Sequence, residues 1–291
     1  MYGELRKAYD IFQNQGIEDP LSEILHLANI ASGGALYKVD SSLRDLSHPD
    51  LSQVAQKRKD GTPMEYILGT AVFAGLRLHC TEKTIIPTEY TKVLVDVVVD
   101  FIKQRQPSVK EQAIIELGTG CGNIAIAIAM QIEGVKILAT DISPEALEIA
   151  RKNLDTYNLS DKITLVCGDL FSPFQGLGYE GSIDLITCNP PYIPTSSLKK
   201  LPPEVVKFQP RIALEAGPYG MDFFSKMIND SILMLKPGGV LVFEIGAGQE
   251  KLVTRILSRN SGYEDIKYFK DEDGVIRVLS AAKRTVSSLE A

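Results

Sequence analysis

The chain has 291 residues, of which 44% are hydrophobic and 23% are charged, as is usual for a globular protein. This length accommodates one α/β domain of roughly 200 residues and a small accessory domain. The formal net charge of −6 argues against strong nonspecific binding to nucleic acid, and the sequence contains no apolar run that approaches the length of a membrane span.

The amino-terminal region has the apolar spacing of helices. Leu21, Ile24 and Leu25 recur three and four positions apart, and His48-Pro49-Asp50 is typical of a helix start. We therefore predict a small helical bundle over residues 1–62, and we expect it to help dock the substrate.

Alternation of apolar and polar residues replaces the helical spacing after Tyr66. Val72-Phe73, a turn at Ala74-Gly75 and the run 76–80 predict a β-hairpin. We place this hairpin in a linker over residues 63–88, which joins the bundle to a larger domain over residues 89–291. In that domain a predicted helix at 91–103 is followed by alternating strands and helices, which indicates a parallel, doubly wound sheet with right-handed crossovers.

A glycine turn follows the first strand of the larger domain. The apolar strand 113–117 leads directly into Gly118-Thr119-Gly120-Cys121-Gly122, and a helix of small residues begins at Asn123. Glycines permit positive φ and a close approach of the backbone to a ligand, so this unit forms a nucleotide-type cradle. The residues assigned to cofactor binding here are Glu116, Gly118, Thr119, Gly120 and Gly122.

The next strand ends at Asp141, about 20 residues further on, where an acid can hydrogen-bond both hydroxyls of a ribose. A glycine loop with a ribose acid fits either a nicotinamide dinucleotide or S-adenosylmethionine (SAM). Glu116 favours SAM, because a carboxylate beside the loop repels a pyrophosphate but suits a cationic amino acid moiety. We therefore expect SAM as the cofactor, S-adenosylhomocysteine as the product, and no metal.

A third acid, Asp169, follows the short strand 163–166. We expect it to hydrogen-bond the adenine amino group, with Leu170 and Ile142 on the two faces of the ring. Ligands of open α/β sheets lie beyond the carboxyl ends of the strands. The glycine loop 118–122, Asp141, Asp169 and Asn189 are therefore predicted to converge on one cleft.

The apolar strand 183–188 ends at Asn189-Pro190-Pro191-Tyr192. Neither proline can donate to a β-ladder, so the strand stops there. The amide oxygen of Asn189 and the carbonyls of Asn189 and Pro190 can accept hydrogen bonds from a planar –NH2 group, while Tyr192 packs against its face. We take all four residues as catalytic, and Asn189, Pro190 and Tyr192 as acceptor-binding; the alternative is a structural turn. Asn189 also borders the cofactor.

These motifs together resemble the HemK/PrmC family, protein-(glutamine-N5) methyltransferases that act on the Gly-Gly-Gln motif of peptide chain release factors. The resemblance covers nearly the whole chain. It rests on the blocks 116–122, 141–147, 168–171 and 189–194, and continues through 61–69, 85–87, 208–217, 235–239 and 243–246.

The family resemblance implies an α/β fold: a class I, Rossmann-like SAM-dependent methyltransferase sheet with a small N-terminal helical domain joined by a β-hairpin. It implies that segments 240–244 and 274–281 form an antiparallel pair at one sheet edge. It also implies a release factor as the protein substrate, and assigns Phe73 and Thr91 to acceptor binding.

One segment departs from the family pattern. After Ile86-Pro87 the family usually shows Arg-Pro-Glu-Thr-Glu, whereas this chain has Thr88-Glu89-Tyr90-Thr91-Lys92, in which only the threonine keeps its place. The change concerns the acceptor rather than the methyl donor. Three acceptors stay open: a release factor, a small molecule or biosynthetic substrate, and a nucleic-acid adenine, which the net charge and the lack of a target-recognition domain disfavour.

The cysteines and histidines show no metal-site or catalytic spacing. The four cysteines lack a C-x-x-C pair, and we expect reduced, buried thiols in a cytoplasmic protein without a signal peptide. The three histidines are scattered, and we expect structural roles for them. These residues are Cys80, Cys121, Cys167, Cys188, His26, His48 and His79.

Overall fold

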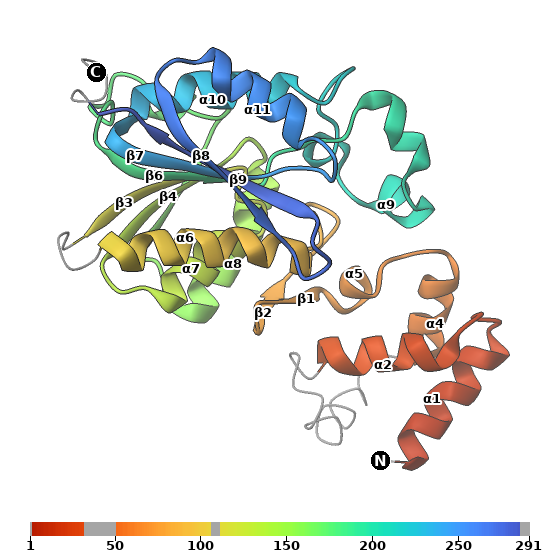
Figure 1. The fold of residues 1–291 in the computed structure, drawn as a ribbon. Coiled ribbons are helices and arrows are strands. Elements are labelled where there is room, and N and C mark those ends of the chain that lie inside the picture. Colours follow the sequence, from red (N-terminus) through yellow and green to blue (C-terminus); the bar gives the residue numbers. More distant parts are fainter. Residues whose placement is uncertain (1, 32–50, 106–110, 286–291) are drawn as a thin grey trace. The chain divides into compact units, whose positions relative to one another are not determined.

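A computed structural model of the chain describes residues 2–31, 51–105 and 111–285. These residues form two compact units (Figure 1). The first comprises the described residues of 1–87 together with 201–210, and the second those of 88–200 and 211–291. Among them, no helix has both the length and the apolar character that a membrane crossing requires. The helix start predicted at His48 lies outside the described residues.

The first unit is helical and carries a short hairpin. Its elements are α1 (Tyr2–Asn14), α2 (Pro20–Ala31), α4 (Leu51–Lys59), α5 (Met64–Leu68), β1 (Thr70–Phe73), β2 (Leu76–His79) and α9 (Pro203–Phe208). Phe12, Leu27 and Met64 are fully buried in its core. The predicted hairpin is confirmed, because β1 and β2 pair antiparallel with Phe73 opposite Leu76.

Helix α9 belongs to the first unit, although it follows the Asn-Pro-Pro-Tyr segment in the sequence. Arg58 of α4 donates to both carboxylate oxygens of Glu23 on α2 at 2.8 Å, and to Glu204 of α9 at 3.0 Å. Lys207 of α9 donates to the Asp60 carbonyl at 3.0 Å. The chain therefore leaves the second unit after residue 200 and returns to it after residue 210.

The second unit contains a seven-stranded sheet and the helices that cover it. Its strands are β3 (Gln112–Leu117), β4 (Val135–Asp141), β5 (Ile163–Cys167), β6 (Ile183–Cys188), β7 (Leu235–Glu244), β8 (Tyr263–Lys270) and β9 (Ile276–Lys283). Its helices are α6 (Lys92–Arg105), α7 (Asn123–Gln131), α8 (Pro144–Tyr157), α10 (Asp222–Met234) and α11 (Glu250–Arg259), with 3₁₀ turns η2 (Glu89–Thr91), η3 (Ser172–Phe174), η4 (Thr195–Lys200) and η5 (Arg211–Ala213).

The sheet is doubly wound, as predicted. The strand order is β5-β4-β3-β6-β7-β9-β8, and the first five strands are parallel. Helices α6, α7 and α8 lie along one face, while α10 and α11 lie along the other (Figure 1). Apolar residues on both faces of each central strand account for this arrangement, because a parallel sheet buries both of its sides.

The register of the parallel strands determines where the predicted site residues lie. Leu117 at the end of β3 is paired with Thr140 of β4 and with Cys188 of β6, and Cys188 is paired with Phe243 of β7. The residues that follow these strands therefore lie side by side along the carboxyl edge of the sheet, where ligands of such sheets bind.

One prediction about the sheet was wrong. Strands β7 and β9 do pair antiparallel, with Phe243 opposite Leu279, but they are not the edge, because β8 lies outside β9. Only Tyr263 of β8 is buried, and its ladder is irregular between Glu264 and Lys267. The alternation that identifies a strand in a sequence is therefore missing from β8.

Candidate active site

The glycine loop between β3 and α7 is open beside its backbone. Gly118, Gly120 and Gly122 have positive φ angles of 66°, 57° and 84°. A Cβ atom on Gly118 or Gly120 would meet no other atom within 4 Å, whereas one on Gly122 would lie 3.3 Å from Ile126 Cδ1. The first two glycines thus leave space for a ligand, and the third allows α7 to pack closely.

Glu116 lies under this loop and is fully buried. Its Oε2 accepts hydrogen bonds from the Thr119 hydroxyl at 2.8 Å and from the Ala125 N–H at 3.1 Å. Its Oε1 is also buried but has no hydrogen-bond partner among the described residues. Burial raises the pKa of Glu116 to about 8, only partly opposed by these two hydrogen bonds. The unpaired oxygen is an acceptor suited to a cationic ligand group.

Asp141 at the end of β4 is held against the glycine loop. Its Oδ2 accepts from the Gly120 N–H at 2.8 Å, and its Oδ1 accepts from the Ser143 N–H at 2.9 Å. Burial raises the pKa of Asp141 above its ordinary value, while the backbone hydrogen bonds lower it. Each carboxylate oxygen keeps a second lone pair, so both can still accept a hydroxyl group such as those of a ribose.

Asp169, Leu170 and Ile142 lie at the ends of β5 and β4. The Asp169 carboxylate is half exposed and pairs with Lys226 of α10, at 2.6 Å between Oδ2 and Nζ. Leu170 is buried with φ of 51°, and Ile142 is 51% exposed. A non-glycine residue in the left-handed region is strained, and such strain is frequent at ligand sites. The adenine contacts of these three residues stay a prediction.

The predicted acceptor corner is tied into a buried cluster. The Asn189 side-chain N–H donates to Thr91 Oγ1 at 3.2 Å, and the Thr91 hydroxyl donates to Glu244 Oε2 at 2.7 Å. The Tyr192 hydroxyl lies 3.4 Å from Glu244 Oε1. Burial raises the pKa of Glu244 to about 7. Thr91 of η2, Asn189 after β6 and Glu244 of β7 thus meet at one point.

The backbone of the corner is fixed by its neighbours. Gln249 donates from Nε2 to the Tyr192 carbonyl at 2.8 Å, and its Oε1 accepts from the Gly246 N–H at 2.9 Å. Pro190 is buried, whereas Pro191 is half-buried. The corner is therefore held from the side of β7, and a Cβ atom on Gly246 would approach the Tyr192 ring to 3.0 Å.

Phe73, the other residue assigned to the acceptor, lies in the first unit, where it is fully buried in β1. Its role in acceptor binding stays a prediction.

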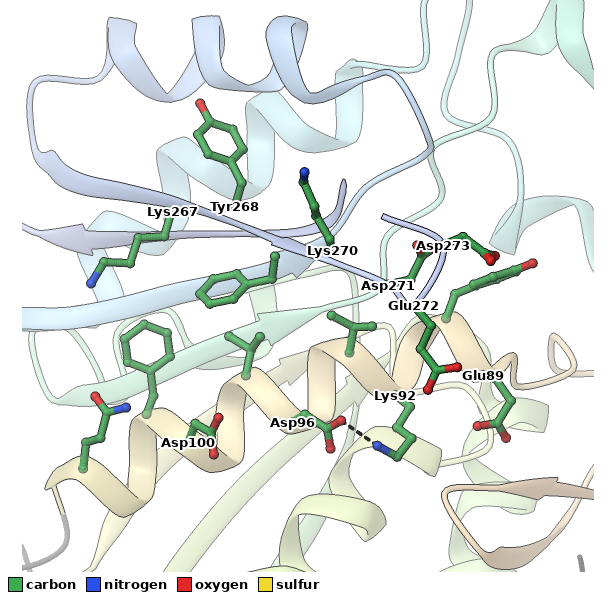
Figure 2. A pocket seen from close by; sticks show the side chains of 16 residues that line it. Glu89, Lys92, Asp96, Asp100, Lys267, Tyr268, Lys270, Asp271, Glu272 and Asp273 are labelled. Atoms are coloured by element: carbon green, nitrogen blue, oxygen red, sulfur yellow. Dashed lines mark hydrogen bonds and ion pairs between the residues drawn. The ribbon is translucent and has the colours of Figure 1, made fainter. Parts of the chain in front are cut away.

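The side chains of segment 88–92, which departs from the family pattern, lie in two different surroundings. Thr91 is 2% exposed and faces the Asn189 cluster. Glu89, Tyr90 and Lys92 instead line a groove of about 920 Å³ between α6 and β8, with Lys92 paired to Asp96 at 2.6 Å (Figure 2). Three of the four substituted residues therefore line this groove, and the retained threonine faces the cluster.

The sequence analysis did not identify three residues of the site, and its prediction that Cys167 is buried was wrong. Lys226, Gln249 and Glu244 contact predicted site residues; Glu244 lies within the motif 243–246, at the end of an apolar run as Glu116 does. Cys167 is exposed rather than buried, because β5 is the outermost strand and the cysteine is its last residue. The other three cysteines are buried, as predicted.

The fold is that of a class I, Rossmann-like SAM-dependent methyltransferase. Residues 88–201 match the family model described as "Methyltransferase small domain". The hMettl16 catalytic domain, solved in complex with a MAT2A 3'UTR hairpin, has the same fold with a TM-score of 0.55 at 17% identity, and the match covers 80% of this chain and 92% of that one.

Two curated relatives cover nearly the whole chain. A release factor glutamine methyltransferase of Rhodopirellula baltica is 32% identical over 278 residues, which are 94% of this chain and 93% of the relative. One of Geobacter sulfurreducens is 34% identical over 269 residues, 91% of this chain and 90% of the relative. The chain belongs to the release factor glutamine methyltransferase family.

Proposed function

We propose that this protein transfers the methyl group of SAM to the side-chain amide nitrogen of a glutamine, that of the Gly-Gly-Gln motif of a peptide chain release factor. The names of the relatives support the acceptor. The observation that carries the chemistry is the orientation of Asn189. Its N–H side is engaged by Thr91, and its Oδ1 has no hydrogen-bond partner among the described residues, so it remains available to an acceptor.

The cofactor side of the site fits SAM. The buried, unpaired Glu116 Oε1 suits the amino group of the methionine moiety, and the spare lone pairs of Asp141 suit the ribose hydroxyls. Asp169, Leu170 and Ile142 would hold the adenine. When bound, SAM supplies a methyl group whose sulfonium leaving group is already activated, so the chain's own residues have only to bind and orient the reactants.

The acceptor nitrogen is the less reactive of the two reactants, because an amide nitrogen is conjugated with its carbonyl and is a poor nucleophile. Asn189 Oδ1 and the Pro190 carbonyl can accept its two N–H groups, which fixes the nitrogen and raises its electron density. This is orientation together with electrostatic preorganisation. The nitrogen becomes more acidic as it gains the methyl group, so no strong base is required among these residues.

A protein acceptor also needs a docking surface, and the first unit is our candidate. Leu21 and Leu25 of α2 are one helical turn apart and are 58% and 51% exposed. Residues four apart on a helix share a face, so these side chains form an adjacent apolar pair. Such a pair supports contact with a protein rather than with a small polar substrate.

The acceptor is tested by tritiated methyl transfer from SAM. The purified enzyme is incubated with a release factor, with the same factor after glutamine-to-alanine replacement in Gly-Gly-Gln, and with DNA. We expect label in the first sample alone. Label in the replaced factor would refute the glutamine assignment, and label in DNA would point to adenine.

A further inference from the structure

The side chain of Asn189 is the end of a hydrogen-bonded line whose other members come from distant parts of the chain. Asn189 follows β6, Thr91 ends η2, and Glu244 ends β7. The parallel register of β6 and β7 pairs Cys188 with Phe243, which brings the next residue of each strand to the same level. Thr91 lies between them, 3.2 Å from Asn189 Nδ2 and 2.7 Å from Glu244 Oε2.

Thr91 has one hydroxyl proton, and this fixes which group donates in each hydrogen bond between Glu244, Thr91 and Asn189. A carboxylate can only accept, so the single hydroxyl proton of Thr91 is donated to Glu244. The Thr91 oxygen then presents only lone pairs to Asn189. Thr88, whose hydroxyl is 3.4 Å away, cannot receive that proton at the same time. The Asn189 amide must therefore turn its N–H side toward Thr91 and its Oδ1 away from it.

We propose that Thr91 and Glu244 are positioning residues that hold the Asn189 amide with its oxygen toward the acceptor nitrogen. This inference rests on the proposed function, in which Asn189 accepts an N–H of the substrate amide. An asparagine amide turned by 180° would present its own N–H groups to the acceptor, and two donors would then face each other. The line from Glu244 through Thr91 selects the productive orientation before the acceptor binds.

This role also explains the pattern of the departing segment. Thr91 is the residue that keeps its place there, and its side chain faces Asn189. Glu89 and Lys92, its neighbours, are exposed and line the outer groove (Figure 2). Thr91 is hydrogen-bonded to Asn189, whereas Lys92 pairs with Asp96 on α6 and Glu89 lines the groove, so Glu89 and Lys92 can vary without moving Asn189.

The line works in this direction only while Glu244 is ionised. A protonated Glu244 would itself donate to Thr91, and the Thr91 proton would then be free to engage Asn189 Oδ1. The charged and titratable groups that face Glu244 are Arg277 of β9, Tyr192, and Cys188 of β6. Burial raises the pKa of Glu244 to about 7 and Arg277 lowers it, so turnover should rise with pH through about 7.

The test compares Thr91→Val, which keeps the shape without the hydroxyl, with Thr91→Ser, which keeps the hydroxyl. Glu89→Gln, an exposed change two residues away, is the matched control. We expect kcat on the release factor to fall by about 10- to 100-fold in Thr91→Val, and to stay within about threefold in Thr91→Ser and Glu89→Gln. SAM affinity measured by calorimetry should be unchanged in all three variants.

A second readout is independent of the acceptor. The side-chain amide resonance of Asn189, observed by ¹⁵N NMR in the SAM-bound enzyme, should move in Thr91→Val and stay in place in Thr91→Ser. Glu244→Gln should lower kcat and remove its pH inflection near 7. Native kcat and an unmoved resonance in Thr91→Val would overturn the inference. If the native enzyme fails on the release factor while the resonance moves as expected, the acceptor assignment fails and the positioning role stands.

Discussion

Replacement of Glu116 by glutamine should stabilise the protein in the absence of SAM, most strongly at alkaline pH. Glu116 is fully buried and its pKa is raised from 4.5 to about 8, with burial as the largest cause. A glutamine of the same shape can accept from Thr119 and Ala125 through its oxygen. It carries no charge in the interior, where an ionised carboxylate is costly.

The size and sign of the change in the free energy of unfolding follow from the difference between the folded and unfolded pKa values of Glu116. The folded and unfolded pKa values of Glu116 differ by about 3.5 units, and each unit corresponds to ~1.4 kcal/mol, so the full effect is about 5 kcal/mol. The unfolded chain loses this proton at lower pH than the folded chain does. The free energy of unfolding therefore falls as pH rises from about 4.5 to about 8, and the native protein loses stability relative to Glu116→Gln across that window.

Urea unfolding of both proteins at a series of pH values between 5 and 9 measures this difference. Glu244, whose pKa is about 7, titrates in both proteins and cancels in the comparison. Calorimetry at pH 7 in buffers of different ionisation enthalpy should also show that SAM binding releases a proton from the native protein but not from Glu116→Gln. If the free energies of unfolding of the two proteins changed in parallel with pH, this account of Glu116 would be refuted.

Three further outcomes are expected. Asp141→Ala should weaken SAM binding by about 1–3 kcal/mol in calorimetry, because it removes a charged partner of the ribose hydroxyls, and unchanged affinity would disprove the ribose assignment. Restoring Arg-Pro-Glu-Thr-Glu at positions 88–92 should change release-factor turnover by less than about threefold, since the altered positions are exposed and three of the four line the outer groove; a large gain in activity would instead show that the segment is tuned for another acceptor. Leu21→Asp with Leu25→Asp should raise KM for the release factor with kcat and SAM affinity unchanged, and an unchanged KM would exclude docking through α2.

The parts of the fold that were predicted correctly have strong local signals. The glycine turn at 118–122 follows an apolar strand directly, Asp141 ends the next strand, and Asp169 follows the one after it. Parallel strands place such residues along one edge whatever their separation in the sequence. The carboxyl-edge position of these residues could therefore be derived from the sequence alone.

The parts that were missed depend on tertiary contacts. Glu244 and Asn189 lie at the same level only because β6 and β7 are in register, and Thr91 bonds to both from a 3₁₀ turn that lies far from either in the sequence. Residues 201–210 contact the first unit through the Arg58–Glu204 ion pair and the Lys207–Asp60 hydrogen bond, which no local pattern reveals. The spacing of residues within one segment cannot reveal contacts between residues that are far apart in the sequence.

The central claim is that Asn189 orients an amide nitrogen for methylation, and single-turnover methyl transfer by Asn189→Ala tests it most directly. The substitution removes the acceptor oxygen but leaves Glu116, Asp141 and the glycine loop in place. We predict that the rate on SAM-saturated enzyme falls by roughly 100-fold or more, with SAM affinity within about threefold of native, because the lost interaction acts on the acceptor in the transition state. Asn189→Asp, which keeps an acceptor of nearly the same size, should retain part of the activity. Near-native turnover by Asn189→Ala would contradict the account and reduce the Asn-Pro-Pro-Tyr corner to a structural turn.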